Sequence, residues 1–174
     1  MSDTLRVILE IGKKRRVVAG AMDWPGLDRW GTTEDDALAR LSAYLPRYAG
    51  VAERAGMGSA FARVLEVEIV ERVPGSSSTD FWGIAHVPSQ IEGEVLSADD
   101  LEKRLDFLSA CWAYFDDVAA RVSAELRPTA RGAGRSRDQV IRHTYGTEPL
   151  NFSRKVHVRT ELDVVLTPDG LATH

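Results

Sequence analysis

The stretch from Trp24 to Leu38 constrains the fold more than any other feature of this chain. It places a Pro-Gly turn, a short strand, a glycine corner and an acidic helix start one after another, with no spare residues between them. Pro25 presets the turn and Gly26 permits a positive φ there. Gly31 lets the strand bend sharply into the helix that follows. These residues are structural, so they predict a scaffold and leave the activity open.

An amphipathic helix is predicted after the glycine corner. Thr32 or Thr33 begins it, since each hydroxyl stands three residues before an aspartate, close to a capping box. Its apolar side chains recur at helical spacing and form one buried face, which comprises Leu38, Leu41, Leu45 and Tyr48. Pro46 should kink or break this helix, and the glycines around residues 56–59 should end it.

Strand patterns flank the helix on both sides. Residues 5–11 alternate between apolar side chains and the charged Arg6 and Glu10, with Ile8 as the exception, which predicts a half-buried strand whose charged side faces water. Residues 16–22 form a second strand, and the basic run at 13–16 is interpreted as a solvated hairpin loop. Residues 27–30 predict a short third strand. Residues 64–73 alternate again and predict a strand with one wet face.

The first part of the chain resembles the HicB-like antitoxin domain. The residues that match its pattern at the same spacing are Pro25, Gly26, Gly31, Thr33, Asp35, Asp36 and Ala37. The strand-strand-strand-helix-strand order fits the same family. The resemblance implies a small, curved antiparallel sheet with a helix against one face, similar to a partial ribonuclease-H-like unit. Relatives are usually antitoxins that cover a toxin and carry a DNA-binding tail, and no ribbon-helix-helix or helix-turn-helix tail is recognisable in this sequence.

The strongest helix pattern lies at residues 97–123. Ser97 and Asp100 form a capping box at its start. Its apolar side chains then step alternately by four and three, which is typical of a bundle or coiled-coil seam: Leu101, Leu105, Leu108, Trp112, Phe115, Ala119 and Val122. A second helix is predicted from Ser136, with Gln139 completing its cap, and Pro149 should end or bend it.

Residues 132–148 are similar to the second helix of DinB-like (YfiT-like) four-helix proteins. A glycine-rich basic loop leads into a capped acidic start, two apolar residues, and then a histidine near Gly and Glu. Residues 97–123 would be the first helix of that bundle. The two modules together also resemble a group of uncharacterised bacterial proteins. The expected fold class is therefore α+β, with a small antiparallel HicB-like sheet unit followed by a helical hairpin that resembles half of a DinB-like bundle.

The DinB-like resemblance implies a divalent metal ion held by three histidines. Only His143 occupies a matching position, because His86, His157 and His174 are scattered along the chain. A catalytic metal site needs three protein ligands and an open position. His143 is therefore a single candidate ligand, and Ni²⁺, Zn²⁺ or Mn²⁺ is expected only if further histidines are supplied. The alternative is a semi-buried histidine that forms a hydrogen bond inside the bundle.

A basic cluster precedes the same helix. Arg131, Arg135 and Arg137 are candidates to hold an anion at the helix start, where backbone N–H groups are unpaired. No catalytic residue is assigned, because capping and solvated helix faces account for the clustered carboxylates. Cys111 lies among apolar neighbours in the middle of a helix, which favours a packed thiol over a nucleophile.

Three segments follow from these patterns. Residues 1–75 are the sheet domain, residues 76–96 a linker packed on the body of the protein, and residues 97–174 the helical domain with an irregular tail. Phe81 and Trp82 are expected to pin the linker, because a free linker would expose them. Residues 167–171 look like a helix start close to the end of the chain, which fits either a fragment or a frayed terminus.

Composition narrows the function classes. The net charge is −4, with both signs mixed along the chain, which argues against nucleic acid or an anionic membrane as a partner. A polar N-terminus without a secretion signal, and no apolar run long enough to cross a bilayer, favour a cytoplasmic location. The preferred hypothesis is a non-enzymatic binding or scaffold protein that forms a homodimer or binds a small protein. The alternatives are a DinB-like metal-dependent hydrolase or thiol transferase that lacks its last metal-binding helix, and a HicB-type antitoxin.

Overall fold

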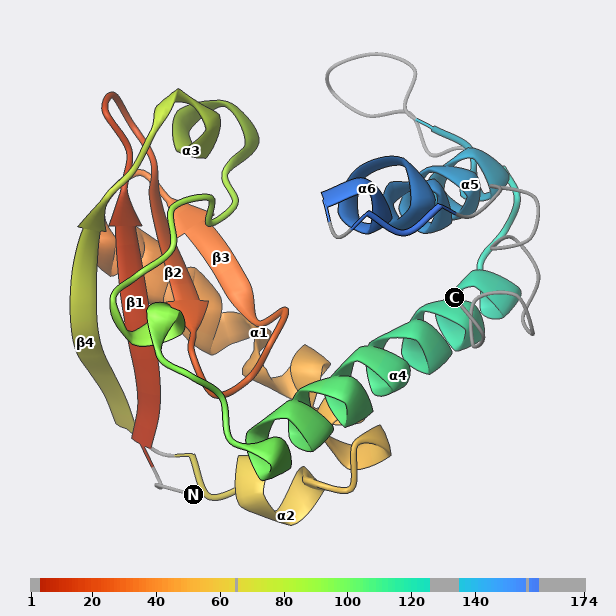
Figure 1. The fold of residues 1–174 in the computed structure, drawn as a ribbon, viewed down its shortest axis with the longest axis horizontal. Coiled ribbons are helices and arrows are strands. Elements are labelled where there is room, and N and C mark those ends of the chain that lie inside the picture. Colours follow the sequence, from red (N-terminus) through yellow and green to blue (C-terminus); the bar gives the residue numbers. More distant parts are fainter. Residues whose placement is uncertain (1–3, 65, 126–134, 156, 160–174) are drawn as a thin grey trace. The chain divides into compact units, whose positions relative to one another are not determined.

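The computed structural model describes residues 4–64, 66–125, 135–155 and 157–159. The chain divides into two compact units, residues 1–114 and 115–174, with the division inside the long helix α4, Ala98–Arg121. The first unit contains the sheet, and the second contains the end of α4 and the helices after it (Figure 1). The α+β class is as expected, and the boundaries at 75 and 97 stay a prediction.

The first unit is built on a four-stranded sheet of order β3-β2-β1-β4 (Figure 1). The strands are β1 Thr4–Ile11, β2 Val17–Ala21, β3 Asp28–Gly31 and β4 Glu66–Pro74. Strands β1, β2 and β3 pair antiparallel, but β4 pairs parallel with β1. The expected antiparallel sheet is therefore wrong for one strand. The helix after β3 carries the chain back along the sheet, so β4 runs in the same direction as β3 and hence as β1.

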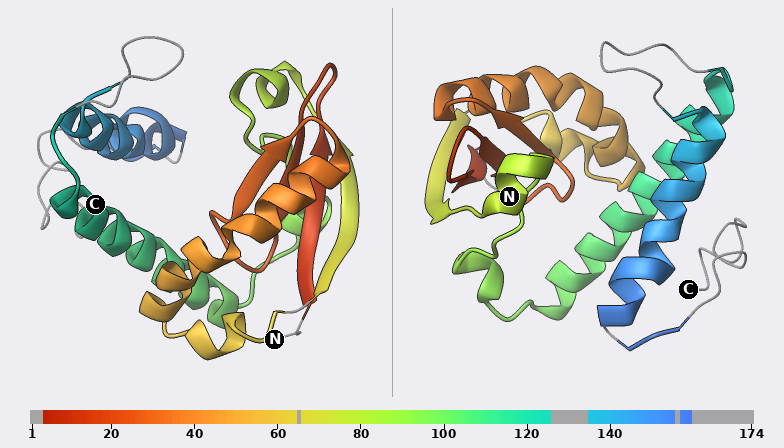
Figure 2. Two further views of the ribbon diagram at one scale, coloured as in Figure 1. Left: turned by 180° about the vertical axis from the view of Figure 1, so that it is seen from behind. Right: turned by 90° about the horizontal axis from the view of Figure 1, so that it is seen from above.

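Helix α1, Glu34–Arg54, lies across one face of the sheet (Figure 2). Its cap forms as predicted: the Thr33 hydroxyl accepts the Asp36 N–H at 3.1 Å, and the Asp36 carboxylate accepts the Thr32 N–H at 2.9 Å. The helix continues through Pro46, so the expected break does not occur. A proline removes only one helical hydrogen bond, and the buried contacts of the helix on both sides of it keep the two halves in register.

Glycine is required at two positions of the turn and corner before α1. Gly26 has φ +83°, the left-handed conformation predicted for it. At Gly31, an added Cβ would lie 2.3 Å from the backbone nitrogen of Ala37. The glycine corner therefore lets the end of β3 approach the first turn of α1 more closely than any side chain permits.

Between the sheet and α1 lies an apolar core with an aromatic cluster at one end. Strand β1 contributes Leu5, Val7 and Leu9, which are fully buried. The ring of Trp24 lies 4.7 Å from that of Phe61 in the short helix α2, Gly58–Phe61, and 5.6 Å from that of Phe107 in α4. The aromatic cluster thus joins the Pro-Gly turn, α2 and α4 in one packed group.

Residues 76–93, which we call the covering segment, lie on the opposite face of the sheet (Figure 1). The segment includes α3, Ser77–Trp82, and a 3₁₀ turn, Ile91–Gly93. Glu10 of β1 is 1% exposed and accepts hydrogen bonds from the Thr79 hydroxyl and from the N–H groups of His86 at 2.6 Å and Val87 at 2.9 Å. The expectation that the charged side of β1 faces water is therefore wrong at Glu10.

Phe81 and Trp82 do not pin the covering segment. Their side chains are 69% and 64% exposed, so the expectation that they pack on the body is wrong. The segment is held by polar contacts instead. Thr79 is fully buried against Glu10, and the Glu71 carboxylate of β4 accepts the Gln90 N–H at 3.0 Å.

The second unit contains α5, Arg137–Thr147, a π-helical turn, Glu148–Phe152, and the short α6, Ser153–Lys155. Ser136 and Gln139 form the predicted capping box, with bonds of 2.8 and 3.3 Å. The α-helix ends at Thr147, two residues before Pro149, as its sequence suggests. The tail pattern at 167–171 lies outside the described residues. None of the helices in the described part of the chain has the length and apolar character needed to span a bilayer.

Candidate interaction surface on α4

Helix α4 is apolar on two sides. On its core side, Phe107 and Ala110 are buried, and Cys111 and Tyr114 pack beside them. On its other side, Leu101, Leu105 and Leu108 are 50%, 54% and 42% exposed. We call Leu101, Leu105, Leu108 and Trp112 the outer stripe. A helix that carries apolar residues on two sides is typical of an element placed between two partners.

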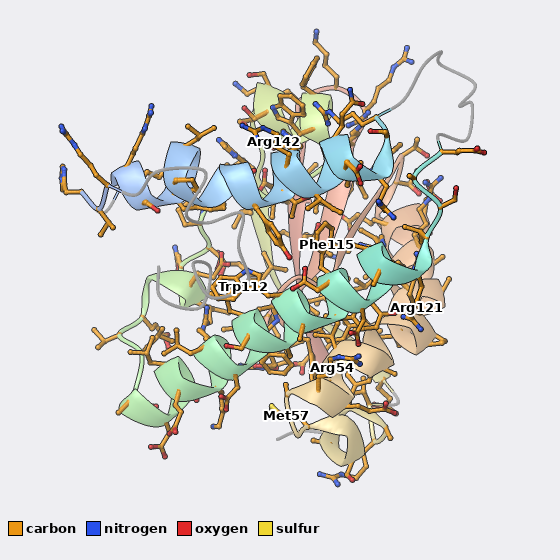
Figure 3. All side chains as sticks on the ribbon, turned by 90° about the vertical axis from the view of Figure 1, so that its right-hand side faces the viewer. Arg54, Met57, Trp112, Phe115, Arg121 and Arg142 are labelled. Carbon is orange, nitrogen blue, oxygen red and sulfur yellow. The ribbon has the colours of Figure 1, made fainter. Side chains whose placement is uncertain are left out.

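The two sides can be followed in Figure 3. Trp112 and Phe115 project from one side of α4, whereas Arg54 and Met57 lie on the other side. The guanidinium of Arg54 stands 5.4 Å from the ring of Tyr114, which is a cation–π contact on the core side. The heptad pattern in the sequence corresponds to the outer stripe, so it identified the side of α4 that the core of the first unit leaves uncovered.

On the core side of α4, sequence reasoning identified Cys111 as a packed thiol but missed the residues beside it. Phe107, Ala110, Cys111 and Tyr114 also recur at steps of three and four, which is the signal that could have identified them. The seven-residue heptad run is the longer of the two patterns, so the sequence favours it as the seam of the helix.

In the second unit, the same seam is partly covered by α5. The ring of Tyr145 lies 5.6 Å from that of Phe115, and the Tyr145 hydroxyl forms a hydrogen bond with Asp116. Burial raises the pKa of the Asp116 carboxyl. The seam residue Phe115 thus packs in the way that the bundle pattern predicts.

The charges beside the outer stripe have both signs. Glu102 follows Leu101, and Arg104 precedes Leu105. Lys103 forms an ion pair with Asp100 at 3.3 Å. No block of like charge lies along this part of the helix. A second copy of the same surface would therefore meet little electrostatic repulsion.

Cys111 is expected to react slowly with alkylating reagents. Burial raises the pKa of its thiol, so little thiolate is present at neutral pH. Iodoacetamide labelling followed by intact-mass spectrometry should show modification at least about tenfold slower than in the urea-unfolded chain. Equal rates in the folded and the unfolded protein would contradict this packing.

The structure brings together only some of the predicted site residues. His143 lies on the exposed side of α5, in a shallow groove that is also lined by Arg135 and Arg142. Arg137 instead donates to Asp138 at 2.8 Å and to the carbonyl of Val122 at 3.4 Å. Arg131 lies outside the described residues. The anion site therefore stays a prediction, and its described members are Arg135 and Arg137.

The predicted metal site also stays a prediction. Within the described ranges, no group of three or more histidine, cysteine, aspartate or glutamate side chains could hold a metal ion. His86 lies in the covering segment, and His157 follows α6. His174 lies outside the described residues.

A cavity of about 330 Å³ lies between the sheet and the covering segment. Asp28 lines it, and burial raises the pKa of its carboxyl. Glu10 lines the same cavity, but its carboxylate is already engaged by the covering segment. Glu10 therefore acts here as an anchor.

Comparison with protein-family models, curated proteins and solved structures found no match to this chain.

Proposed function

We propose that this protein is a non-enzymatic association module whose outer stripe binds the same stripe of a second copy. The observation that carries the proposal is the exposure of Leu101, Leu105 and Leu108 on a helix whose other side is already packed. Fully burying one leucine contributes about 1.5–3 kcal/mol. Three half-exposed leucines in one row therefore offer a substantial gain to any partner that covers them.

A second copy suits this surface better than an unrelated partner. The leucines step by four and three, so an identical stripe can interlock with them through knobs-into-holes packing. A twofold axis places the same patch on both subunits, which makes a self-complementary row sufficient. The opposite charges of Glu102 and Arg104 allow two outer stripes to come together without strong repulsion. A small protein partner that presents an amphipathic helix would use the same stripe.

The family resemblance of the first unit is also part of this proposal. We infer that the first unit is a HicB-like sheet domain. The order β1-β2-β3-α1-β4, with the short α2 between α1 and β4, and the turn at Pro25 and Gly26 support this inference. In this reading the sheet domain is the scaffold that holds α4 through the aromatic cluster. The association surface is then presented by a rigid body and not by a free helix.

Leu105→Glu is expected to dissociate the dimer. A charge buried without a partner costs about 3–5 kcal/mol, which weakens association by at least about a hundredfold. Light scattering after size exclusion at micromolar concentrations should give a dimer for the natural chain and a monomer for Leu105→Glu. Val95→Glu is the matched control, since Val95 is almost fully exposed just before α4. This control should remain a dimer.

Two results would contradict the proposal. One is a natural chain that stays strictly monomeric over the whole concentration range. The other is a Leu105→Glu variant that associates as strongly as Val95→Glu. Circular dichroism of both variants should match the natural chain, which separates lost association from lost folding.

A further inference from the structure

One end of the sheet carries cations and exposed aromatic rings side by side. The hairpin loop between β1 and β2 lies near α3 at this end (Figure 1). Lys13, Lys14 and Arg15 are exposed in the loop, and Phe81 and Trp82 are exposed in α3. These five residues form what we call the basic–aromatic tip. Lys13, Lys14, Phe81 and Trp82 line one open cavity of about 590 Å³. The aromatic side chains are exposed although they lie within a segment that is otherwise firmly anchored.

The tip is a built structure and not a loose loop. The Asp80 carboxylate accepts the N–H groups of Lys14 at 2.9 Å, Arg15 at 3.0 Å and Arg16 at 3.2 Å. These backbone hydrogen bonds stabilise the ionised carboxylate and so lower the pKa of Asp80, and the bond from Arg15 contributes most. The Arg16 guanidinium donates to the carbonyl of Phe81 at 2.8 Å. The lysines of the loop and the rings of α3 are therefore held beside each other before any partner arrives.

We propose that the basic–aromatic tip binds the surface of an anionic lipid bilayer. Tryptophan and other aromatic rings favour the zone between headgroups and acyl chains. Lysine and arginine side chains bind the phosphate groups of anionic lipids just above that zone. At the tip, Phe81 and Trp82 provide the first component, and the exposed loop cations provide the second.

The geometry of the two rings favours a bilayer over single-stranded nucleic acid. The rings of Phe81 and Trp82 meet edge to face, with centroids 4.5 Å apart and an interplanar angle of 86°. Bases stack on open ring faces along a groove, whereas an edge-to-face pair forms a compact apolar wedge. Such a wedge suits insertion between lipid headgroups.

The acidic character of the whole chain orients this binding. The net charge is −4, and on that ground the sequence argued against an anionic membrane. Charges are screened over about 8 Å at physiological salt, so the local cations of the tip dominate at contact. The acidic remainder is repelled, which favours an approach with the tip toward the bilayer.

Vesicle co-sedimentation and tryptophan emission test the proposal. The probes are phosphatidylcholine vesicles with and without phosphatidylglycerol. Binding is expected only with phosphatidylglycerol, and it should weaken as salt is raised. A blue shift of tryptophan emission should accompany binding and be lost in Trp82→Phe. The double variant Lys13→Glu/Lys14→Glu should bind at least about tenfold more weakly, since each basic residue near the surface contributes about a factor of five.

Matched controls change the same residue types elsewhere on the chain. Lys155 and Phe152 are exposed in the second unit, and Lys155→Glu and Phe152→Ser should bind vesicles like the natural chain. Circular dichroism should show that every variant is folded. The proposal is overturned if the anionic vesicles are not bound, if phosphatidylcholine alone binds equally well, or if the tip variants match the controls. Preferential binding of a single-stranded oligonucleotide that displaces the vesicles would also overturn it.

Discussion

Trp24→Ala is expected to lower the free energy of unfolding of the first unit by about 3–5 kcal/mol. Trp24 is 2% exposed, and its ring contacts those of Phe61, Phe107 and Tyr48. The substitution removes this buried area and leaves a cavity where the Pro-Gly turn, α2 and α4 meet. Domains of ordinary size are stable by only about 5–15 kcal/mol, so the variant should sit close to unfolding.

Urea unfolding followed by far-ultraviolet circular dichroism measures this effect without relying on the tryptophan that is removed. Trp82→Ala is the matched control, because Trp82 is exposed in the same unit. Its change should stay within about 0.5 kcal/mol. Similar losses for Trp24→Ala and Trp82→Ala would mean that the aromatic cluster is not the centre of this core.

Glu10→Ala is expected to destabilise the first unit by about 2–4 kcal/mol and to release the covering segment. The substitution leaves the N–H groups of His86 and Val87 and the hydroxyl of Thr79 without their hydrogen-bond acceptor. A buried donor left without an acceptor costs about 1–3 kcal/mol. When the covering segment moves away from the sheet, these donors can form hydrogen bonds with water instead.

Hydrogen exchange read by mass spectrometry should show this release as faster exchange in residues 76–91, with α1 less affected. Glu71→Ala is the comparison, since Glu71 holds the same segment through bonds to Gln90 at 3.0 Å and Ile91 at 3.4 Å that are more exposed. Its effect should be clearly smaller. A Glu10→Ala variant with natural exchange rates in the covering segment would contradict the anchoring role of this carboxylate.

Local features of the first unit were predictable because each is decided by neighbouring residues. The cap at Thr33, the left-handed Gly26 and the close approach at Gly31 depend on contacts within a few positions. The direction of β4 depends on where the crossover through α1 returns the chain. An alternating pattern identifies a strand but not the neighbour beside which it will pair.

The errors about Glu10 and the aromatic residues of α3 have one cause. A carboxylate in an alternating strand is normally expected to face solvent. The Glu10 carboxylate instead accepts the N–H groups of His86 and Val87, and only the folded chain brings these distant residues together. Polar contacts hold the covering segment on the sheet, so Phe81 and Trp82 can stay exposed. The sequence rule that large aromatic residues pin a segment therefore failed where a buried polar anchor replaced them.

The candidate surfaces were predictable to different degrees. The heptad pattern correctly marks the outer stripe as one surface, but the pattern alone does not tell whether the same chain covers it. The cations at 13–16 and the rings of α3 are far apart in sequence, and Asp80 joins them only in the folded chain. Arg135 and Arg142 likewise meet at one groove with His143 through helical spacing.

The parallel pairing of β1 with β4 has a consequence for the order of events during protein synthesis. Strand β1 emerges first from the ribosome and can form its hairpin with β2 at once, but its other edge pairs with Glu66–Pro74. Until that segment has left the exit tunnel, the nascent chain presents an unpaired strand edge to its surroundings. The time needed to translate α1 and the residues up to Pro74 therefore sets how long this edge stays open to pairing with another chain.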